Sequence, residues 1–374
     1  MPPSSGGDPE LAEITRRIAE RGLAPSASIT VSMRRSGGWH RYSAAVGGAR
    51  SPAVTPETPY DLASLTKPIV AVTACKLAND GSFKLIDPIA TWLPQLSELP
   101  VGSATIEQAL SHRSGLHGHR VLFNGLWQHR AVSRRQMLLT AAQSIRTECV
   151  SLRPTYPARP VYSDLGYLLI GAILERVAGI ALDELLFRSI GQSLGAPILS
   201  SRQWQGHDAN FCERVAPTEY VQWRGGTLTG VVHDENAWAW AGYGTAGHAG
   251  LFGTSPAVAR FGEAMIDALA CRPSPIPRFV ALVCTAKREG GTLRAGFDGI
   301  SAARSSAGQR MNRLAFGHLG FTGTSLWCDP VNEFVFALLT NRVHPRRSDL
   351  RLPSARGEIH DQLFAWAETK AHSI

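Results

Sequence analysis

The spacing of apolar residues near the start of the chain predicts one helix followed by a hairpin. Residues 9–21 place apolar side chains at helical spacing and end next to Gly22, which is typical of an amphipathic helix. Two β-rich runs, 26–33 and 39–46, are joined by a short link that contains Ser-Gly-Gly. Such a pattern predicts two antiparallel strands.

The far end of the chain repeats these signals in the opposite order. A strand pattern over 314–327 is followed by a turn, a second strand over 334–340 and a helical pattern over 355–371. The middle, from about 103 to 230, is rich in helical patterns such as 166–186. Strands at both ends with helices between them predict an α+β fold, in which an antiparallel sheet is built from both chain ends and flanked by helices. The mainly helical middle is then an inserted region.

The organisation of the chain favours a single main domain. It shows no internal repeat and no long low-complexity linker. We therefore expect an N-terminal segment and helix over 1–22 that pack on the sheet. One domain would follow over 23–370, with its helical subregion at about 103–230.

Composition excludes several classes of protein. The chain has 374 residues, of which 44% are hydrophobic and 18% charged, so it is too apolar for a disordered protein. The net charge of +8 raises the question of nucleic-acid binding. However, the arginines are spread along the whole chain in blocks no longer than two, and no nucleic-acid-binding motif accompanies them. We expect no nucleic-acid partner.

The cysteines and the chain start give expectations about the compartment. No two of the six cysteines lie within four residues of each other, so neither a zinc knuckle nor a CxxC redox pair is present. The start lacks a basic-then-apolar signal, and no apolar run approaches the length of a membrane span. The sequence therefore predicts a cytoplasmic protein without a membrane partner.

One motif that suggests catalysis is better explained by local structure. Residues 191–195 match G-x-S-x-G, the nucleophile elbow, which requires a strand before the serine and a helix after it. Here a helical pattern over 182–190 precedes the motif and Pro197 follows it. We interpret this segment as a turn that ends a helix.

The histidines do not predict a metal site. His112, His117 and His119 lie close together in the chain without neighbouring carboxylates, and the segment 233–235 lacks the second histidine of a zincin helix. We expect His112, His117, His233 and His248 to form structural hydrogen bonds. No glycine-rich phosphate loop occurs, and we expect neither a metal nor an organic cofactor.

A serine and a lysine three residues apart give the stronger chemical signal. Ser64 and Lys67 follow an extended run over 58–62 and open an apolar helix, with Pro68 in its first turn. Residues three apart on a helix share one face, so the lysine nitrogen can reach the serine hydroxyl. Such a lysine can activate the serine as a nucleophile. Because a Ser-x-x-Lys match alone is common by chance, it needs support from elsewhere.

Two further segments supply that support. In the first, Tyr162, Ser163 and Asp164 stand at the start of an apolar helical pattern. In the second, residues 317–324 place His318 among three glycines at the start of a strand. Glycines inside a strand indicate that another backbone, such as that of a substrate, approaches closely.

In this order, the three segments resemble the motifs of the class C β-lactamase-related serine hydrolases, which include penicillin-binding-protein-like D,D-peptidases, β-lactamases and family VIII-type esterases. Those motifs are S-x-x-K, Y-x-N or a variant, and K-T-G or H-x-G. Residues 110–116, 232–237 and 247–254 are also similar to segments of that group. The resemblance extends from about 27 to 364 and implies a β-lactamase/transpeptidase-like fold.

The resemblance also implies roles for residues at the matching positions. Ser64 would be the nucleophile that becomes acylated, and Lys67 would share or relay its proton. Tyr162 would help to deprotonate the serine and to protonate the leaving group. The backbone N–H groups of Ser64 and of Phe321, which follows Gly320, would form the oxyanion hole.

The third motif and two departures from the family pattern bear on specificity. His318 would steer a substrate carboxylate or polarise the tyrosine. Asp164 replaces the asparagine of β-lactamases and cannot donate a hydrogen bond when ionised, and Leu319 replaces a hydroxyl residue. Both losses weaken recognition of a β-lactam. Asp164 could instead pair with Lys67 and hold it charged, which would shift the role of base to Tyr162.

The sequence therefore predicts a serine hydrolase that forms an acyl-enzyme on Ser64 and cleaves a small acyl ester or amide. The alternatives are β-lactamase or D,D-peptidase activity on a lactam or peptide, transfer of the acyl group to an alcohol or amine, and a catalytically idle protein that binds such ligands. The sequence leaves the physiological substrate and the oligomeric state open.

Overall fold

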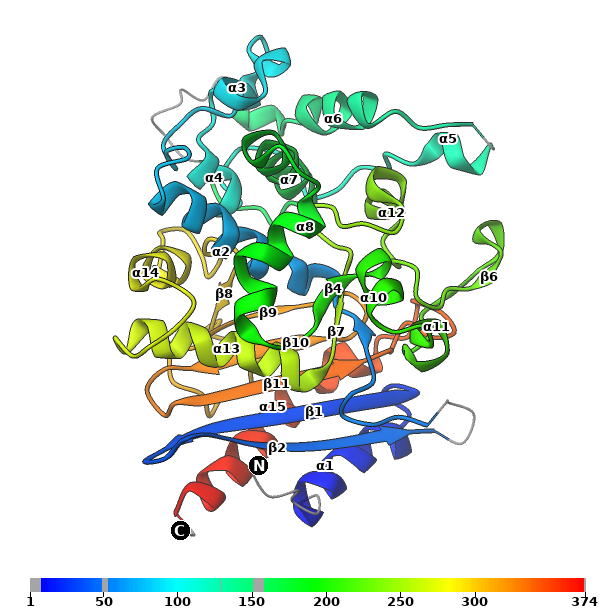
Figure 1. Cartoon of the computed structure of the whole chain (residues 1–374), viewed down its shortest axis with the longest axis vertical. Helices are drawn as coiled ribbons and strands as arrows, with labels where there is room; N and C mark the ends of the chain where they lie inside the picture. The colour runs from blue at the N-terminus through cyan, green and yellow to red at the C-terminus, as the bar shows by residue number, and fades with distance from the viewer. Residues whose placement is uncertain (1–7, 49–52, 129, 151–157, 373–374) are drawn as a thin grey trace.

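The computed structural model describes residues 8–48, 53–128, 130–150 and 158–372 (Figure 1). Its centre is an antiparallel six-stranded sheet in the order β2-β1-β11-β10-β9-β8, built from both ends of the chain as expected. The strands are β1 (Ser26–Arg35), β2 (Gly38–Gly47), β8 (Asp298–Gly299), β9 (Phe316–Leu319), β10 (Ser325–Asp329) and β11 (Phe334–Thr340). The α+β prediction is confirmed.

Helices cover both faces of this sheet. On one face lie α1 (Pro9–Glu20) and α15 (Arg351–His372), and on the other lies α13 (Ser255–Leu269) (Figure 1). Strand β11 shows the consequence, because Phe336 and Leu338 join the apolar cluster under α1 and α15 while Ala337 and Leu339 join the cluster on the opposite side. A strand buried on both faces is apolar at every position, which explains the continuous run Phe334–Leu339.

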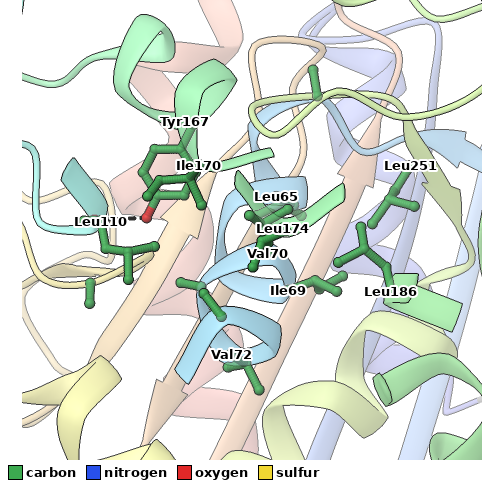
Figure 2. Close-up of a cluster of buried hydrophobic side chains, with 14 of the residues drawn as sticks. Leu65, Ile69, Val70, Val72, Leu110, Tyr167, Ile170, Leu174, Leu186 and Leu251 are labelled. Carbon is green, nitrogen blue, oxygen red and sulfur yellow. Dashed lines mark hydrogen bonds between the residues drawn. The ribbon is translucent and has the colours of Figure 1, made fainter. Parts of the chain in front are cut away.

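The helical region lies above the sheet and surrounds α2 (Thr66–Asn79) (Figure 1). Every residue of α2 from Thr66 to Cys75 is buried, so this helix is a core element. Figure 2 shows its apolar side chains packed with those of α7 (Asp164–Ala178), and the hydroxyl of Tyr167 donates to the carbonyl of Leu110 at 2.8 Å. This packing fixes the helix that begins just after Ser64.

The other helices of the region are mostly short. They are α3 (Ile89–Trp92), α4 (Ile106–Leu110), α5 (Asn124–Trp127), α6 (Arg134–Gln143), α8 (Leu182–Leu186), α9 (Gln192–Leu194), α10 (Ser201–His207), α11 (Phe211–Arg214), α12 (Glu235–Ala241) and α14 (Arg278–Thr285). The 3₁₀-helices are η1 (Ala63–Leu65), η2 (Pro94–Leu96), η3 (Pro100–Ser103), η4 (Thr147–Cys149) and η6 (Gln222–Arg224), and η5 (Phe187–Gly191) is a π-helix.

Five short strands complete the fold. A three-stranded sheet has the order β3-β7-β4, and a two-stranded sheet pairs β5 with β6. Their bounds are β3 (Tyr60–Asp61), β4 (Ile198–Ser200), β5 (Tyr220–Val221), β6 (Gly226–Thr227) and β7 (Leu251–Gly253).

Three sequence patterns are resolved more finely by the structure. The helical pattern over 166–186 contains two helices, because Gly179 adopts a left-handed conformation (φ +69°) that ends α7. The strand pattern over 314–327 contains β9 and β10, separated by a turn. Residues 191–195 end a helix at Gly195, also left-handed, as we expected for this motif.

Within the described residues no single helix is long and apolar enough to span a membrane. Helix α7 reaches the required length and hydropathy only together with residues 182–194, from which it is separated by a 77° bend.

Candidate active site

Ser64 lies on a tight turn between β3 and α2. Ala63 just before it has φ +47°, a backbone conformation that costs a residue other than glycine about 1–2 kcal/mol. The buried carboxylate of Asp61 holds this turn, because Oδ1 accepts from the N–H of Ala63 at 2.8 Å and Oδ2 accepts from the N–H of His233 at 2.7 Å. Asp61 therefore fixes the turn that carries Ser64 and also ties it to His233.

The turn between β9 and β10 is fastened to the same segment. Thr322 Oγ1 donates to the carbonyl of Asp61 at 2.7 Å, and Thr324 Oγ1 donates to that of Leu62 at 3.0 Å. A Cβ on Gly320 would lie 2.6 Å from the Leu62 oxygen, so only glycine permits this approach. Among the described residues, the N–H of Phe321 donates to no protein acceptor. It is thus available, beside the Ser64 turn, as the oxyanion donor that the family resemblance implies.

Lys67 is fully buried beneath Ser64. Its Nζ donates to Ser64 Oγ at 2.8 Å and to the carbonyl of His248 at 3.1 Å, and it forms an ion pair with Asp164 Oδ1 at 2.7 Å. Burial lowers the pKa of Lys67, but Asp164 and Tyr162 outweigh it and raise the pKa above its ordinary value. Burial by itself would raise the pKa of Asp164. The charge of Lys67 outweighs burial and holds the pKa of Asp164 well below its usual range. Both members of the pair are therefore charged at neutral pH.

Tyr162 lies over this pair. Lys67 Nζ is 4.8 Å from the centre of its ring, and the ring of His112 is 4.8 Å away on a tilted plane. Burial raises the pKa of Tyr162, while the charge of Lys67 and hydrogen bonds with Lys67 and Ser64 oppose that rise. Because Lys67 already donates to Ser64 Oγ, the hydrogen of the serine is free to point to Tyr162.

His318 is a neutral member of the site. Burial and then the charge of Lys67 lower its pKa to about 3. Its Nδ1 donates to the carbonyl of Leu319 at 2.8 Å, so Nε2 is left as an acceptor. The ring centre lies 5.8 Å from that of Tyr162. The family resemblance implies that His318 either steers a substrate carboxylate or polarises Tyr162. A neutral ring has no charge with which to steer a carboxylate, so the second role is favoured.

The site opens into a cavity of about 860 Å³ whose lining is chemically mixed. Its apolar lining includes Phe123 and Trp127, and Phe123 stacks on Trp223 with ring planes 2° apart. Its basic lining includes Arg342 and Arg356. The sequence-predicted residues that line the same cavity are Ser64, Tyr162, Asp164, His318, Gly320 and Phe321, and Lys67 is buried next to Ser64.

The three arginines that line the cavity differ in their partners. Arg347 pairs with Glu219 at 2.5 Å and also with Glu235. Arg342 lies 4.8 Å from the centre of the Phe321 ring and donates to the backbone carbonyls of Arg347 and Asp349. Arg356 is buried, its Nε has no hydrogen-bond partner, and within the described part of the chain no carboxylate faces it. Burial and the charge of Arg342 lower the pKa of Arg356, which marks a cation that lacks an anion.

Most of the other histidines form structural hydrogen bonds, as the sequence predicted. His112 accepts from the N–H of Ser163 at 2.9 Å. His233 and His248 face carboxylates at 3.0 Å, Glu219 and Asp234 respectively. His117 hydrogen-bonds through its backbone, whose carbonyl accepts from Ser163 Oγ at 2.7 Å.

Three contributors to the site were missed in the sequence: Asp61, Arg356, and His119, whose Nδ1 lies 3.6 Å from Asp164 Oδ2. An aspartate two residues before a turn often caps it, and this signal could have found Asp61. Arg356 stands on the apolar face of α15 between the buried Leu352 and Ile359. A charge on the buried face of a helix is the signal that could have found it.

Comparison with known proteins shows which family and which folds this chain is similar to. The Beta-lactamase family model matches residues 12–360. A putative D-alanyl-D-alanine carboxypeptidase of Escherichia coli (strain K12) is 28% identical over 344 residues, 84% of this chain and 79% of that protein. Among solved structures, EstCE1, a hydrolase with promiscuous acyltransferase activity, superposes with a TM-score of 0.69 at 18% identity, covering 94% of this chain and 97% of that one. The D-amino acid amidase of Ochrobactrum anthropi SV3 gives 0.70 at 16% identity, covering 97% and 98%.

Proposed function

The chain belongs to the β-lactamase family of serine hydrolases, and we propose that Ser64 is its nucleophile and that it cleaves ester or amide bonds of small acyl substrates through an acyl-enzyme. The observation that carries this assignment is the 2.8 Å contact between Lys67 Nζ and Ser64 Oγ at the base of the cavity. The family resemblance alone names these residues, whereas the contact gives them a shared geometry.

The proposed acylation uses the charged Lys67–Asp164 pair. Ser64 Oγ attacks the carbonyl carbon while its proton passes to Tyr162 Oη and Tyr162 passes its own proton to the leaving alcohol or amine. The N–H groups of Ser64 and Phe321 stabilise the oxyanion, and Lys67 stays charged and stabilises the partial negative charge on Ser64 Oγ during the transfer. In the second step water attacks the acyl-enzyme, its proton passes to Tyr162 while Tyr162 returns a proton to Ser64 Oγ, and the acid is released.

The apolar lining of the cavity supports an acyl group as the part of the substrate that it contacts. Phe123, Trp127 and Val121 offer a surface without charge, and Trp127 and Val121 remain partly exposed within it. Burial of apolar area contributes ~25 cal/mol per Å². We therefore expect esters of medium-length acyl chains to react with a higher kcat/KM than acetate esters. A cytoplasmic location stays a prediction from the sequence.

Labelling of the protein tests the assignment directly. The protein is incubated with a fluorophosphonate and, separately, with p-nitrophenyl esters of increasing chain length and a chromogenic cephalosporin. We expect a mass adduct on Ser64 and ester turnover, both abolished in Ser64→Ala. Ester turnover that survives Ser64→Ala would overturn the mechanism. Cephalosporin turnover faster than ester turnover would show that the losses at Asp164 and Leu319 do not exclude β-lactams.

A second candidate activity is the removal of a residue that carries a free carboxylate from a peptide. Arg356, buried without an anionic partner, and the neighbouring Arg342 favour it, because a substrate carboxylate would supply the missing charge. Matched dipeptides with a free carboxylate or a C-terminal amide separate the two activities. Faster cleavage of the free acid supports the peptidase, and equal rates support the simple esterase or amidase.

A further inference from the structure

Four aromatic side chains, Phe123, Trp127, Trp223 and Trp238, form one cluster beside the cavity. The rings of Phe123 and Trp223 are stacked with their centres 5.8 Å apart. Trp127 meets both of these rings nearly at right angles, at 5.1 Å and 6.1 Å, and Trp238 lies 5.9 Å from Trp223. Stacked and edge-to-face pairs are the arrangements in which aromatic rings attract each other beyond simple burial. We call these four residues the aromatic cluster.

The aromatic cluster is covered at one end and open at the other. At the covered end, the guanidinium of Arg224 lies 4.4 Å from the centre of the Trp238 ring. Phe123 is buried, and Trp223 and Trp238 are half-buried. Trp127 is 51% exposed and lines the same cavity as Ser64. The open end of the cluster is therefore accessible to a substrate that reaches Ser64.

Hydrogen bonds connect the covered end of the cluster to the turn that carries the nucleophile. Arg224 donates to the carbonyl of His233 at 3.1 Å. The N–H of His233 in turn donates to Asp61, the carboxylate that holds the Ser64 turn. The cluster and the nucleophile are thus fixed to the same short segment.

The loop that leads into Phe123 is fastened to helix α12. The buried Asn236 donates to the carbonyl of Arg120 at 2.8 Å and accepts from the N–H of Leu122 at 2.9 Å. Trp238 lies on the same helix. A surface that is already ordered loses little conformational freedom when a ligand binds to it. The cluster is therefore a preformed contact surface.

An aromatic ring is the substrate group that best matches the open end of this cluster. A ring placed against Trp127 can adopt the stacked or edge-to-face geometry that the four side chains already show among themselves. A saturated ring of similar size gains the burial of apolar area but lacks the attraction between ring faces and ring edges. The cluster can therefore distinguish the two kinds of ring, which a purely aliphatic surface cannot do.

We propose that the aromatic cluster is a binding site for an aromatic ring carried by the acyl group of the substrate. The proposal rests on the proposed function, because it places this ring relative to an acyl-enzyme on Ser64. It narrows the substrate class from small acyl compounds to esters and amides of aryl-substituted acids. Trp127 is then a specificity-determining residue that contacts the substrate away from the reacting atoms.

The test compares ethyl 3-phenylpropanoate with ethyl 3-cyclohexylpropanoate, whose acyl groups differ in the aromatic character of the ring. The ethyl leaving group has no ring that could occupy the site. The ratio of kcat/KM for the phenyl ester to that for the cyclohexyl ester is measured by base consumption in the wild type, Trp127→Leu and Trp127→Phe. We expect the ratio to be about two- to tenfold higher in the wild type than in Trp127→Leu. Dividing the two ratios cancels the difference in intrinsic reactivity, and Trp127→Phe should keep most of the preference because it retains a ring.

The matched control is Tyr243→Leu, because Tyr243 is 53% exposed and lies outside the cavity lining. It should keep the wild-type ratio, and fluorophosphonate labelling of Ser64 shows that each variant is folded. Benzyl acetate and cyclohexylmethyl acetate place the same two rings on the alcohol instead. A ratio that Trp127→Leu leaves unchanged, or an aromatic preference confined to the alcohol pair, would overturn the proposal. Ester turnover that is lost in Ser64→Ala supports the proposed function in either case.

Discussion

Two buried cations of the site differ in their partners: Lys67, which lies beneath Ser64, and Arg356, which lines the cavity. Lys67 has a carboxylate 2.7 Å away, and the pair lowers the pKa of the acid and raises that of the base. Arg356 is also buried, but its charged neighbour is another cation, Arg342, and its pKa is lowered. A buried charge without a partner costs stability, and an external anion at Arg356 would offset that cost.

From this difference we propose separate tasks for the two cations. The Lys67–Asp164 pair is complete within the protein and lies under Ser64, so we assign it to the chemistry. Arg356 has no anionic partner among the described residues, so we assign it to substrate binding. We group His318, whose pKa burial lowers to about 3, with the proposed chemistry rather than with the binding of a carboxylate. The predictions below test this division.

The largest effect is expected from Lys67→Met. The variant removes the cation from Ser64 and leaves Asp164 with the histidines His119 and His248 as basic neighbours, so kcat should fall ~10²–10⁴-fold. Breaking a buried ion pair costs about 3 kcal/mol in the free energy of unfolding. Ester turnover and urea unfolding at pH 7 measure the two losses.

The double variant Lys67→Met/Asp164→Asn separates these losses. It replaces the pair with neutral side chains and should recover most of the stability while staying inactive. A double variant that recovers activity would show that the ion pair takes no part in the chemistry. One that stays as unstable as Lys67→Met would show that the pair contributes nothing specific to folding.

The next effect concerns the proton path from Ser64. Tyr162→Phe should reduce kcat ~10²-fold or more, because it removes the hydroxyl that receives the serine proton. His318→Ala should cost less, since the neutral imidazole acts on Tyr162 rather than on the substrate. Steady-state kcat values for one ester compare the two variants. The reverse order would make His318 the principal base and contradict the division drawn above.

A smaller and more selective effect is expected from Arg356→Met. A charge-assisted hydrogen bond contributes about 1.5–3 kcal/mol, so kcat/KM for substrates with a free carboxylate should fall ~10–100-fold. Neutral esters should react as before, and the free energy of unfolding should be unchanged or higher. The control is Arg347→Met, which lines the same cavity but breaks the pairs with Glu219 and Glu235 and should lower stability. Equal losses for neutral and anionic substrates would show that Arg356 is structural.

The two cations also show which parts of the site a sequence can reveal. Ser64 and Lys67 are three residues apart on one helix, so their contact follows from local geometry. The α+β fold followed from periodicity, and the resemblance located Tyr162 and His318. Arg356 could not be placed in the same way. Its exposure to the cavity depends on how α15 packs across the sheet, and its lack of a partner depends on residues far away in the chain.

His119 illustrates the same limit more sharply. From the sequence it belonged to a histidine cluster that suggested and then failed to support a metal site. Its approach to Asp164 is created by hydrogen bonds from two distant segments, at Ser163–Asp164 and at Asn236, and by the absence of a side chain at Gly118. None of these contacts leaves a periodic or local signal.

The smallest effect is a pH dependence of stability that the ion pair has and Arg356 lacks. The pKa of Asp164 is lower in the folded state than its usual value near 3.8, so the folded protein binds fewer protons at this carboxylate than the unfolded chain. Its contribution to stability is therefore present above pH 4 and is lost as the pH falls below that value. Urea unfolding at pH 6, 4, 3 and 2.5 should show that the free energy of unfolding of the wild type falls on the order of 1–2 kcal/mol more than that of Asp164→Asn.

Arg356→Met should follow the wild-type curve, because an arginine stays protonated throughout this range. Parallel curves for the wild type and Asp164→Asn would mean that Asp164 is not held by Lys67 in the folded protein. The contrast between a paired and an unpaired buried cation would then rest on Arg356 alone.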